Sequence, residues 1–388
     1  MYIKLRQKLE VENITHIKKL GIVISALLLI LLFVIFSTAT EQKTNKTTTD
    51  TKIIIIDALG REVTLDKPAE RIAYTHYSVA EVLKAVGAWD RVVARDGYIS
   101  DENFYPNLDK IPAICPARNP MDINYEKTIE TQPDVLILPK FEWYGTTEEI
   151  INALEPDIPV VFVDTLNPDS FCDTIKIIGM VTGNEEEAQE YIEFYSGIYD
   201  PIVAKTSQIS QEDRFNVFYK AFSDTPEQIK TYGKDMPGGN EFFNAAGGKN
   251  IAGDLSFAYG DVDKEWVLEQ DIDAIVVMCW DQHYLDTFGY AVNDSELAFE
   301  RGKEIQEEIM RQDVFAHTDA VKNKKVYLLH NELLSTPRNI IAIAYMAKWF
   351  YPEEFPDLDP EALHQEYLDR FIKADYNLSN AGLFAYPA

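Results

Sequence analysis

The chain alternates short apolar runs with segments of helical periodicity from residue 71 onward. The four apolar runs of its first half are rich in β-branched residues, as buried strands are, and comprise RIAYT, RVVA, DVLIL and PVVFV. Between these runs the spacing of apolar residues predicts helices at 79–86, 125–131, 147–154 and 169–180. Strands that alternate with helices in this way are typical of an α/β lobe with a largely parallel sheet.

A second alternation of the same kind follows a long helical stretch. Residues 185–205 keep a helical pattern with Pro201 near its end, and the apolar runs FNVFY, AIVVM and KVYLL come after it. We therefore expect the long helix to separate two lobes. Ahead of the first lobe, IIIIDALGREVTL pairs two β-branched runs around Ala58-Leu59-Gly60, which predicts a β-hairpin.

One segment of the first lobe returns in the second. YEKTIETQPDVLIL (125–138) and KEWVLEQDIDAIVV (264–277) superpose at a constant offset of 139, which pairs Glu126 with Glu265 and Asp134 with Asp273. The match continues past the predicted strands, where aromatic loops correspond. Two lobes of like construction would place these loops at the carboxyl ends of equivalent strands, where α/β sheets bind ligands. The sequence thus predicts a ligand cleft between two lobes.

The N-terminal part contains an apolar run that is much longer than those of the predicted strands. Residues 20–40 hold no charged residue and are long enough to cross a hydrocarbon layer of roughly 30 Å. Lysines and an arginine precede the run, which favours a cytoplasmic N-terminus and a single-pass anchor with the globular part outside the cell. Cleavage after Ser37-Thr38-Ala39, as in a signal peptide, stays an alternative. No cysteine directly follows the run, so lipid modification there is not expected.

Residues 41–52 are polar and rich in threonine, as flexible stalks are. The expected domains are a cytoplasmic segment (1–19), an anchor or signal (20–40), the stalk (41–52), an N-terminal lobe (53–183), an interlobe helix (184–206) and a C-terminal lobe (207–388).

Composition excludes several classes of function. Beyond residue 40 the chain carries 31 basic and 62 acidic residues, a net charge of −31, so nucleic acid is not expected as a partner. Cys115, Cys172 and Cys279 are odd in number and lack C-x-x-C spacing, so neither a zinc ribbon nor a disulfide framework is predicted, although a Cys115–Cys172 bridge stays open. Without a P-loop, a G-x-S-x-G elbow or an H-E-x-x-H motif, we expect neither nucleotide binding nor hydrolase chemistry.

Several phrases, in order between residues 53 and 371, resemble the class III periplasmic binding proteins of iron-siderophore, haem and cobalamin ABC importers. They are DALGREVTLDKPAERIAY, HYSVAEVLKAVG, YEKTIETQPDVLIL, EFFNAAGGKNIA, VDKEWVLEQDIDAIVV and AVKNKKVYLLHNELLSTPR. The resemblance implies two Rossmann-like α/β lobes joined by a single long helix, with the ligand between them. It also implies that Glu126 and Glu265 dock on arginines of the permease. Their alternative role is to complement the dipoles of their own helices.

The loops expected to line the cleft are rich in aromatic and basic residues. Aromatic faces can cover a flat apolar ligand, and an arginine can pair with the oxygens of a chelate. Arg338, in the motif STPR, matches a position near the ligand in the resembling family, and Lys140 is a further cation near the cleft. The candidate ligand-binding residues are His76, Tyr77, Arg95, Tyr98, Arg118, Phe141, Trp143, Tyr144, Tyr219, Tyr232, Trp280, His283, His330 and Arg338.

The histidines among these candidates lack the spacing of a zinc site, so no metal site in the protein itself is predicted. We expect an extracytoplasmic substrate-binding protein, a monomer at the cell membrane, that delivers a metal chelate to an ABC permease dimer with its ATPase subunits. The ligand is expected to contain iron or cobalt, and the protein needs no cofactor and is no enzyme. A free metal-ion binder and a chelatase-like enzyme are the alternatives.

Overall fold

The structure is a computed structural model that describes residues 52–117, 119–140, 147–155, 157–223, 225 and 228–387. The predicted anchor at 20–40 and all of the stalk except Lys52 lie outside the described residues. Within the described part of the chain, no helix is both long and apolar enough to cross a membrane. Residues from Lys52 onward form one compact unit, and the predicted α/β class is confirmed.

The first half of this unit is built on a four-stranded parallel sheet in the order β4-β3-β5-β6. The predicted hairpin, β1 (Ile53–Ile56) with β2 (Glu62–Leu65), precedes it. All four predicted strands and all four predicted helices of this half are confirmed, with bounds that differ by a few residues. They are β3 (Ile72–Tyr74), α2 (Tyr77–Ala85), β4 (Val92–Ala94), α3 (Tyr125–Glu130), β5 (Val135–Pro139), α4 (Thr147–Leu154), β6 (Val160–Val163) and α5 (Phe171–Thr182).

The second half is built on a seven-stranded mixed sheet. Its path is β10-β8-β7-β11-β12-β13, and β9 also pairs with β7. The three predicted strands β7 (Phe215–Lys220), β11 (Ala274–Cys279) and β12 (Val326–His330) are confirmed and run parallel to one another. The other elements are β8 (Lys230–Tyr232), α7 (Gly239–Ala245), β9 (Gly248–Asn250), β10 (Tyr259–Asp261), α8 (Lys264–Leu268), α9 (Ser295–Arg311), α10 (Asp319–Lys322), α11 (Asn331–Ser335), α12 (Asn339–Phe350), α13 (Pro360–Tyr367) and β13 (Ala385–Tyr386).

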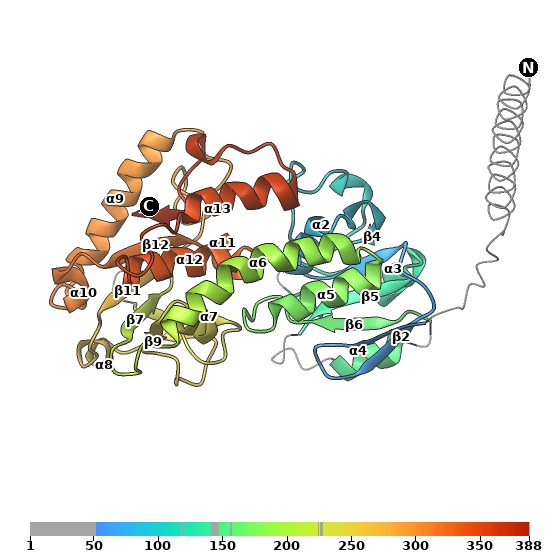
Figure 1. Cartoon of the computed structure of the whole chain (residues 1–388), viewed down its shortest axis with the longest axis horizontal. Coiled ribbons are helices and arrows are strands. Elements are labelled where there is room, and N and C mark those ends of the chain that lie inside the picture. Colours follow the sequence, from blue (N-terminus) through green and yellow to red (C-terminus); the bar gives the residue numbers. More distant parts are fainter. Residues whose placement is uncertain are drawn as a thin grey trace, which may run out of the picture. The chain divides into compact units, whose positions relative to one another are not determined.

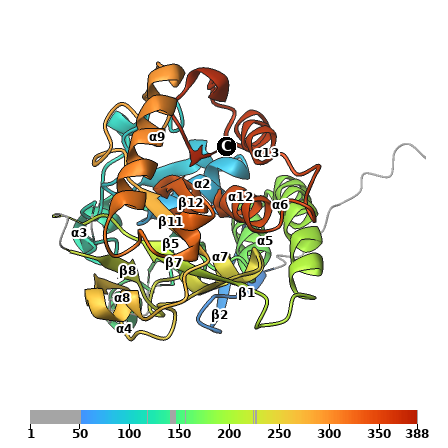
Figure 2. The ribbon, with the colours of Figure 1, turned by 90° about the vertical axis from the view of Figure 1, so that its left-hand side faces the viewer.

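The long predicted helix is α6 (Glu185–Thr206), which continues through Pro201. It packs against α2 and α5 from the first half and against α7 and α12 from the second, and it spans both halves in Figure 1. Viewed from the end in Figure 2, α5, α6, α12 and α13 lie on one side of the strands, while α9 stands apart from them. One layer of helices therefore covers both sheets.

The central strands of the two sheets are buried on both faces, because alternate residues belong to different cores. In β5, Val135 and Ile137 join the large core under α6, whereas Leu136 and Leu138 join a smaller core with α4. The large core also takes in Val217, Val276 and other residues of the second sheet. Since this apolar core is continuous between the two sheets, hydrophobic burial holds the two halves together.

The internal repeat is a repeat of structure. Helix α3 and strand β5 correspond to α8 and β11 at the same offset, and each strand lies parallel to the first strand of its half. The Asp134 carboxylate accepts the backbone N–H groups of Glu70 and Arg71, each at 2.9 Å. The Asp273 carboxylate accepts the backbone N–H of Asn216 at 2.9 Å. Each aspartate thus fixes the start of the neighbouring strand.

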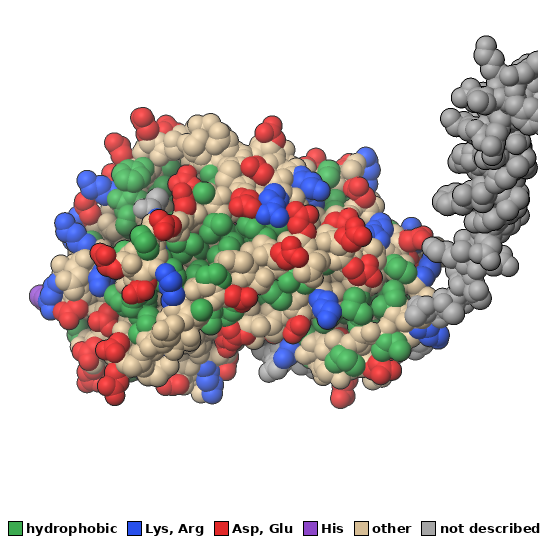
Figure 3. Space-filling view, in the orientation of Figure 1, with side chains coloured by type: hydrophobic (Ala, Val, Ile, Leu, Met, Phe, Trp, Pro, Cys, Tyr) green, Lys and Arg blue, Asp and Glu red, His purple; other side chains and the backbone are tan. Residues whose placement is uncertain are grey.

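The surface reflects the excess of acidic residues. Asp and Glu side chains are spread over the whole of the face shown in Figure 3, with Lys and Arg between them. On this face the negative charge is dispersed, which fits a role in solubility.

Candidate functional site

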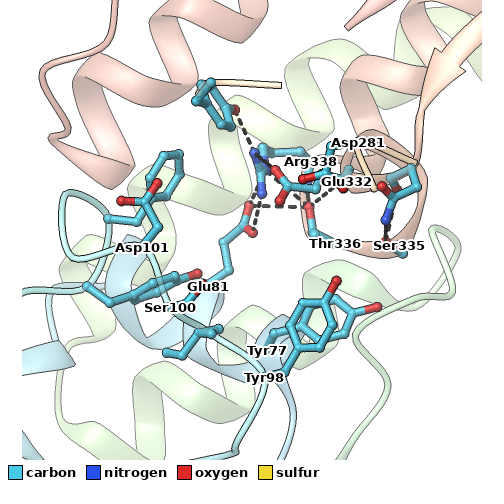
Figure 4. A pocket seen from close by; sticks show the side chains of 15 residues that line it. Tyr77, Glu81, Tyr98, Ser100, Asp101, Asp281, Glu332, Ser335, Thr336 and Arg338 are labelled. Atoms are coloured by element: carbon cyan, nitrogen blue, oxygen red, sulfur yellow. Dashed lines mark hydrogen bonds and ion pairs between the residues drawn. The ribbon is translucent and has the colours of Figure 1, made fainter. Parts of the chain in front are cut away.

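A cavity of about 180 Å³ lies where the carboxyl ends of strands from both sheets meet (Figure 4). Its walls come from the segments that follow β3, β4, β11 and β12. Ligands of open α/β sheets bind at this end of the strands. The lining residues are Tyr77, Glu81, Tyr98, Ile99, Ser100, Asp101, Phe104, Tyr105, Asp281, Tyr290, Asn331, Glu332, Ser335, Thr336 and Arg338.

An ion pair between the two halves forms the back of the cavity. Nε and Nη2 of Arg338 donate to the two carboxylate oxygens of Glu81 at 2.9 and 3.1 Å. Nη1 of Arg338 donates to the Tyr290 hydroxyl at 2.6 Å and to Glu332 Oε2 at 3.2 Å. The side chains of Arg338 and Glu81 are only 4% and 1% exposed. Most donors of the guanidinium are therefore already used within the protein.

The positions of this pair follow from the local sequence. Glu81 stands on α2 among buried apolar neighbours, so the packing of this helix carries its carboxylate inward. Arg338 lies between Pro337 and the first residue of α12, and it is the N-cap residue of that helix. The Tyr367 hydroxyl donates to Glu81 Oε1 at 2.8 Å. The carboxylate is thus held from two elements of the second half.

The electrostatics of the pair oppose its burial. Desolvation raises the pKa of the Glu81 carboxyl, and the Arg338 guanidinium acts against that rise. Desolvation would lower the pKa of Arg338, but the carboxylates of Glu81 and Glu332 raise it above its ordinary value. The two-pronged geometry favours the ionised form of both partners.

Aromatic rings form the sides of the cavity. The rings of Tyr77 and Tyr98 lie 4.7 Å apart between centroids, and Figure 4 shows them together at one side. The rings of Phe104 and Tyr290 lie 5.0 Å apart, and the Arg338 guanidinium carbon is 5.4 Å from the Phe104 centroid. Such faces can contact an apolar or a cationic group of a ligand.

The charge of the walls is negative. Four carboxylates line the cavity, those of Glu81, Asp101, Asp281 and Glu332. Among the described residues around it, Arg338 is the only cationic side chain. Because Arg338 is paired with Glu81, the remaining carboxylates leave the cavity with a negative potential.

A second cavity, of about 490 Å³, lies at the carboxyl ends of β5 and β6. It is lined by residues from both halves, among them Lys140, Asp164, Asn167, Lys234 and Glu241. Its charged lining side chains are two lysines and three carboxylates, so the charges nearly balance.

The predicted binding residues of the first half have different positions. Tyr77 and Tyr98 line the first cavity. His76 caps α2 and accepts the Ser78 backbone N–H at Nδ1, and burial lowers its pKa to about 3. Arg95 donates to backbone carbonyls of Ile111 and Asp96 at 3.0 and 2.7 Å. Arg118, Phe141, Trp143 and Tyr144 lie outside the described residues.

The candidate binding residues of the second half also have different positions. Only Arg338 among them lines the first cavity in the part of the chain that the structure describes. The rings of Tyr219 and Tyr232 pack on each other in the large core, with 4.5 Å between ring centroids. Trp280 is partly buried and packs against the same core. His283 is stacked on Phe222 with 3.6 Å between ring centroids.

His330 points into the core at the end of β12. Its ring lies parallel to Phe288, at 6.1 Å, and edge-on to Phe384. Neither ring nitrogen has a hydrogen-bond partner among the described residues, and burial lowers its pKa below the ordinary value.

Several lining residues carried no signal that singled them out in the sequence. Phe104, Tyr105 and Asp101 lie in the segment between β4 and α3, which lines the cavity from the first half, and Tyr290 comes from the long segment between β11 and α9. Glu81 carried the clearest available signal, because it is an acidic residue at a buried position of an apolar helix face.

The described residues include no group of three or more His, Cys, Asp or Glu side chains placed to hold a metal ion. All three cysteines are free: Cys115 and Cys279 are buried and Cys172 is half-buried. The Cys115–Cys172 bridge is therefore absent.

Glu126 and Glu265 stand on the first turns of α3 and α8 and are exposed. Within the described part of the chain, neither carboxylate has an ion-pair or hydrogen-bond partner. The side chain of Asn124 caps α3 instead, by accepting the Lys127 backbone N–H at 2.9 Å.

Comparison with known proteins gives a consistent set of similarities. The family model described as periplasmic binding protein matches residues 72–333. An uncharacterised ABC transporter substrate-binding lipoprotein of Bacillus subtilis, YvrC, is 25% identical over 348 residues, which cover 88% of this chain and 99% of that protein. The molybdate-binding protein MolA of Haemophilus influenzae is 21% identical, over 86% of this chain and 91% of its own length.

Among solved structures, the TroA-like periplasmic binding protein FepB of Veillonella parvula superposes with a TM-score of 0.71 at 25% identity. The superposition covers 86% of this chain and 99% of FepB.

Proposed function

The chain belongs to the periplasmic binding protein family, and we propose that it is the extracytoplasmic substrate-binding protein of an ABC importer, binding a metal chelate between two α/β lobes joined by α6. The observation that carries this proposal is the aromatic-walled cavity formed by loops from both sheets. Residues 20–40 would tether it to the membrane as a single-pass helix, whereas the relative YvrC is described as a substrate-binding lipoprotein.

The cavity supports a chelate of a particular charge. Its carboxylates would repel a ligand of net negative charge, such as haem with ionised propionates, and Arg338 is not free to compensate. We therefore propose a neutral or positively charged chelate of iron or cobalt, in which the metal is cargo and not a resident cofactor. MolA carries molybdate, an anion, so the ligand of this chain would differ from that of its relative.

The size of the cavity also bears on the ligand. Pockets that enclose a drug-sized molecule typically measure about 300–1,000 Å³. A cavity of about 180 Å³ is smaller, so we expect one arm of the chelate to enter it while the remainder lies outside, against Tyr98. Tyr98 is well placed for this contact because it is 44% exposed at the rim.

The binding role of this cavity can be tested with two matched tyrosines. Tyr98→Ala should weaken binding of the chelate by about 1–3 kcal/mol, the usual loss for an aromatic anchor. Tyr259→Ala is the control, because Tyr259 is 47% exposed but lies on β10, away from the cavity. The measurement is calorimetric titration of the full-length protein in detergent with a cationic ferric hydroxamate, cobalamin and haem. Equal affinities for wild-type protein and the Tyr98→Ala variant would contradict the proposed site.

Delivery to the permease is proposed to use the two exposed glutamates. A two-fold symmetric permease presents two equivalent basic patches, and Glu126 and Glu265 are equivalent positions of the structural repeat. Reversing both charges (Glu126→Arg, Glu265→Arg) should abolish uptake, while ligand affinity and thermal stability stay close to those of wild type. Uptake by cells and the melting temperature of the same variants are the measurements. A large fall in melting temperature would assign the glutamates to helix stabilisation instead.

A further inference from the structure

Two large aliphatic side chains are exposed at equivalent positions of the structural repeat. Ile129 on α3 is 49% exposed, and Leu268 on α8, at the offset of 139, is 53% exposed. The neighbouring positions also agree, since Thr128 and Val267 are buried. Each short helix therefore turns one residue into the protein and leaves the next, aliphatic one in solvent.

A single exposed aliphatic residue needs no explanation, because most protein surfaces contain some. A pair is different when both members recur at the same point of a duplicated unit. Folding does not require them, since neither side chain belongs to a hydrophobic core. Leu285, which is 76% exposed, has no such counterpart, because the equivalent position holds Thr146.

Each aliphatic side chain lies one helical turn after an exposed glutamate. Residues three apart in a helix project from the same face, so Ile129 stands beside Glu126 and Leu268 beside Glu265. An exposed acid follows each of them directly, Glu130 and Glu269. The result is two matched patches, which we name the α3 patch (Glu126, Ile129, Glu130) and the α8 patch (Glu265, Leu268, Glu269).

The two patches have the placement that a two-point contact needs. In Figure 1, α3 and α8 lie toward opposite ends of the two-sheet unit. In Figure 2, both helices lie on the side away from α6. A single flat partner could therefore contact both patches at once.

We propose that the α3 and α8 patches dock on a two-fold symmetric membrane partner through Ile129 and Leu268, each of which inserts into an apolar pocket rimmed by basic residues. This inference rests on the proposed function, since the partner is the importer's permease. The rim of each pocket on the partner is expected to be basic, because each patch offers two carboxylates around one aliphatic side chain. Two-fold symmetry of the partner requires the two pockets to be alike, as the two patches are.

The aliphatic and acidic parts of each patch act on different steps. Rim charges mainly accelerate encounter and give it a salt dependence, whereas a desolvated apolar contact mainly slows dissociation. Loss of the half-exposed apolar surface of one side chain should speed dissociation about fivefold to tenfold. Because the pockets are equivalent, the two single changes should have effects of similar size.

The experiment uses full-length protein and the importer's permease complex in lipid nanodiscs, with association and dissociation rates measured on a sensor surface. The variants are Ile129→Gln, Leu268→Gln and the double change, with Leu285→Gln as the matched control. We expect each single change to speed dissociation about fivefold to tenfold and the double change more than twentyfold, with the control at the wild-type rate. Melting temperatures should stay close to that of wild type, because about half of each side chain is exposed and neither belongs to a hydrophobic core.

Each of the other outcomes contradicts a specific part of the docking proposal. Wild-type dissociation of the double variant, while Glu126→Arg with Glu265→Arg still loses binding, refutes the apolar contacts and leaves carboxylate docking intact. If wild-type protein with bound chelate does not bind the permease, the proposed function fails together with this inference. A dimer of the protein that light scattering detects, and that Ile129→Gln disperses, would assign the patches to self-association and refute membrane docking.

Discussion

His330 shows how burial of one residue ties the stability of the protein to pH. Its ring is enclosed by Phe288 and Phe384, without a hydrogen-bond partner among the described residues, and burial lowers its pKa. The native ring therefore binds fewer protons than the unfolded one. The stability that the neutral ring contributes is complete above the unfolded pKa of about 6.5 and is lost as the pH falls below it.

We expect His330→Leu to remove this dependence. Relative to wild type, the variant should gain free energy of unfolding as the pH falls below about 6.5, by at most about 1.4 kcal/mol for each pH unit, the value for one proton. Urea unfolding at several pH values measures it, and His317→Leu controls for loss of an exposed imidazole. A constant difference between variant and wild type over this range would show that folding does not lower the pKa of His330.

At the scale of the element, two glycines of neighbouring helices have opposite roles. A Cβ atom on Gly197, in α6, would meet nothing within 4 Å. A Cβ atom on Gly179, in α5, would lie 2.5 Å from the Cβ of Ala188 in α6, a distance that real structures do not tolerate. Gly179 therefore sets the close packing of α5 on α6, whereas Gly197 costs α6 helix propensity without a packing role.

Alanine substitutions separate these two roles. Gly197→Ala should raise the free energy of unfolding by about 0.5–1 kcal/mol, because alanine favours the helix. Gly179→Ala should lower it by about 1–3 kcal/mol, the usual cost of overpacking between elements that cannot move apart. Chemical unfolding monitored by circular dichroism measures both values. Destabilisation by Gly197→Ala would mean that α6 has to bend at this position, four residues before Pro201.

At the scale of the whole molecule, buried polar bonds connect the two halves at a few points. Glu81 from the first half meets Arg338 and Tyr367 from the second. Tyr195, on α6, donates its hydroxyl to Asn339 at 2.8 Å, where α12 begins. Together with the continuous core, these bonds predict that the halves unfold as one cooperative unit and move little relative to each other.

A double-mutant cycle tests the largest of these connections. Arg338→Leu leaves the Glu81 carboxylate buried without its cation and should cost about 3–5 kcal/mol in free energy of unfolding. Changing Glu81→Leu as well removes the unpaired charge, so the double variant should be more stable than Arg338→Leu alone. Urea unfolding of wild type, both single variants and the double variant supplies the four values. Additive losses would show that the two side chains are not coupled.

Much of the fold could be predicted from hydrophobic periodicity, because each signal is local. The apolar run at 134–138 became β5, the helical pattern at 185–205 became α6, and the offset of 139 corresponds to a real structural repeat. The candidate site proposed at the first cavity was predicted less completely. Tyr77, Tyr98 and Arg338 lie together at the first cavity, and other candidates such as Tyr219 pack in the core. An aromatic residue that follows a strand can either line a cavity or pack in the core, and its sequence neighbours do not decide which.

The sequence alone determined the α/β class, the order of the strands along the chain and the end of each sheet at which we propose the ligand site. Strand and helix periods, and the rule that parallel strands bind ligands at their carboxyl ends, depend only on nearby residues. The tertiary structure alone decided that Glu81 pairs with Arg338, 257 residues later, and that the cavity is acidic. Whether a charge is free for a ligand depends on which distant side chain packing places against it and removes from water.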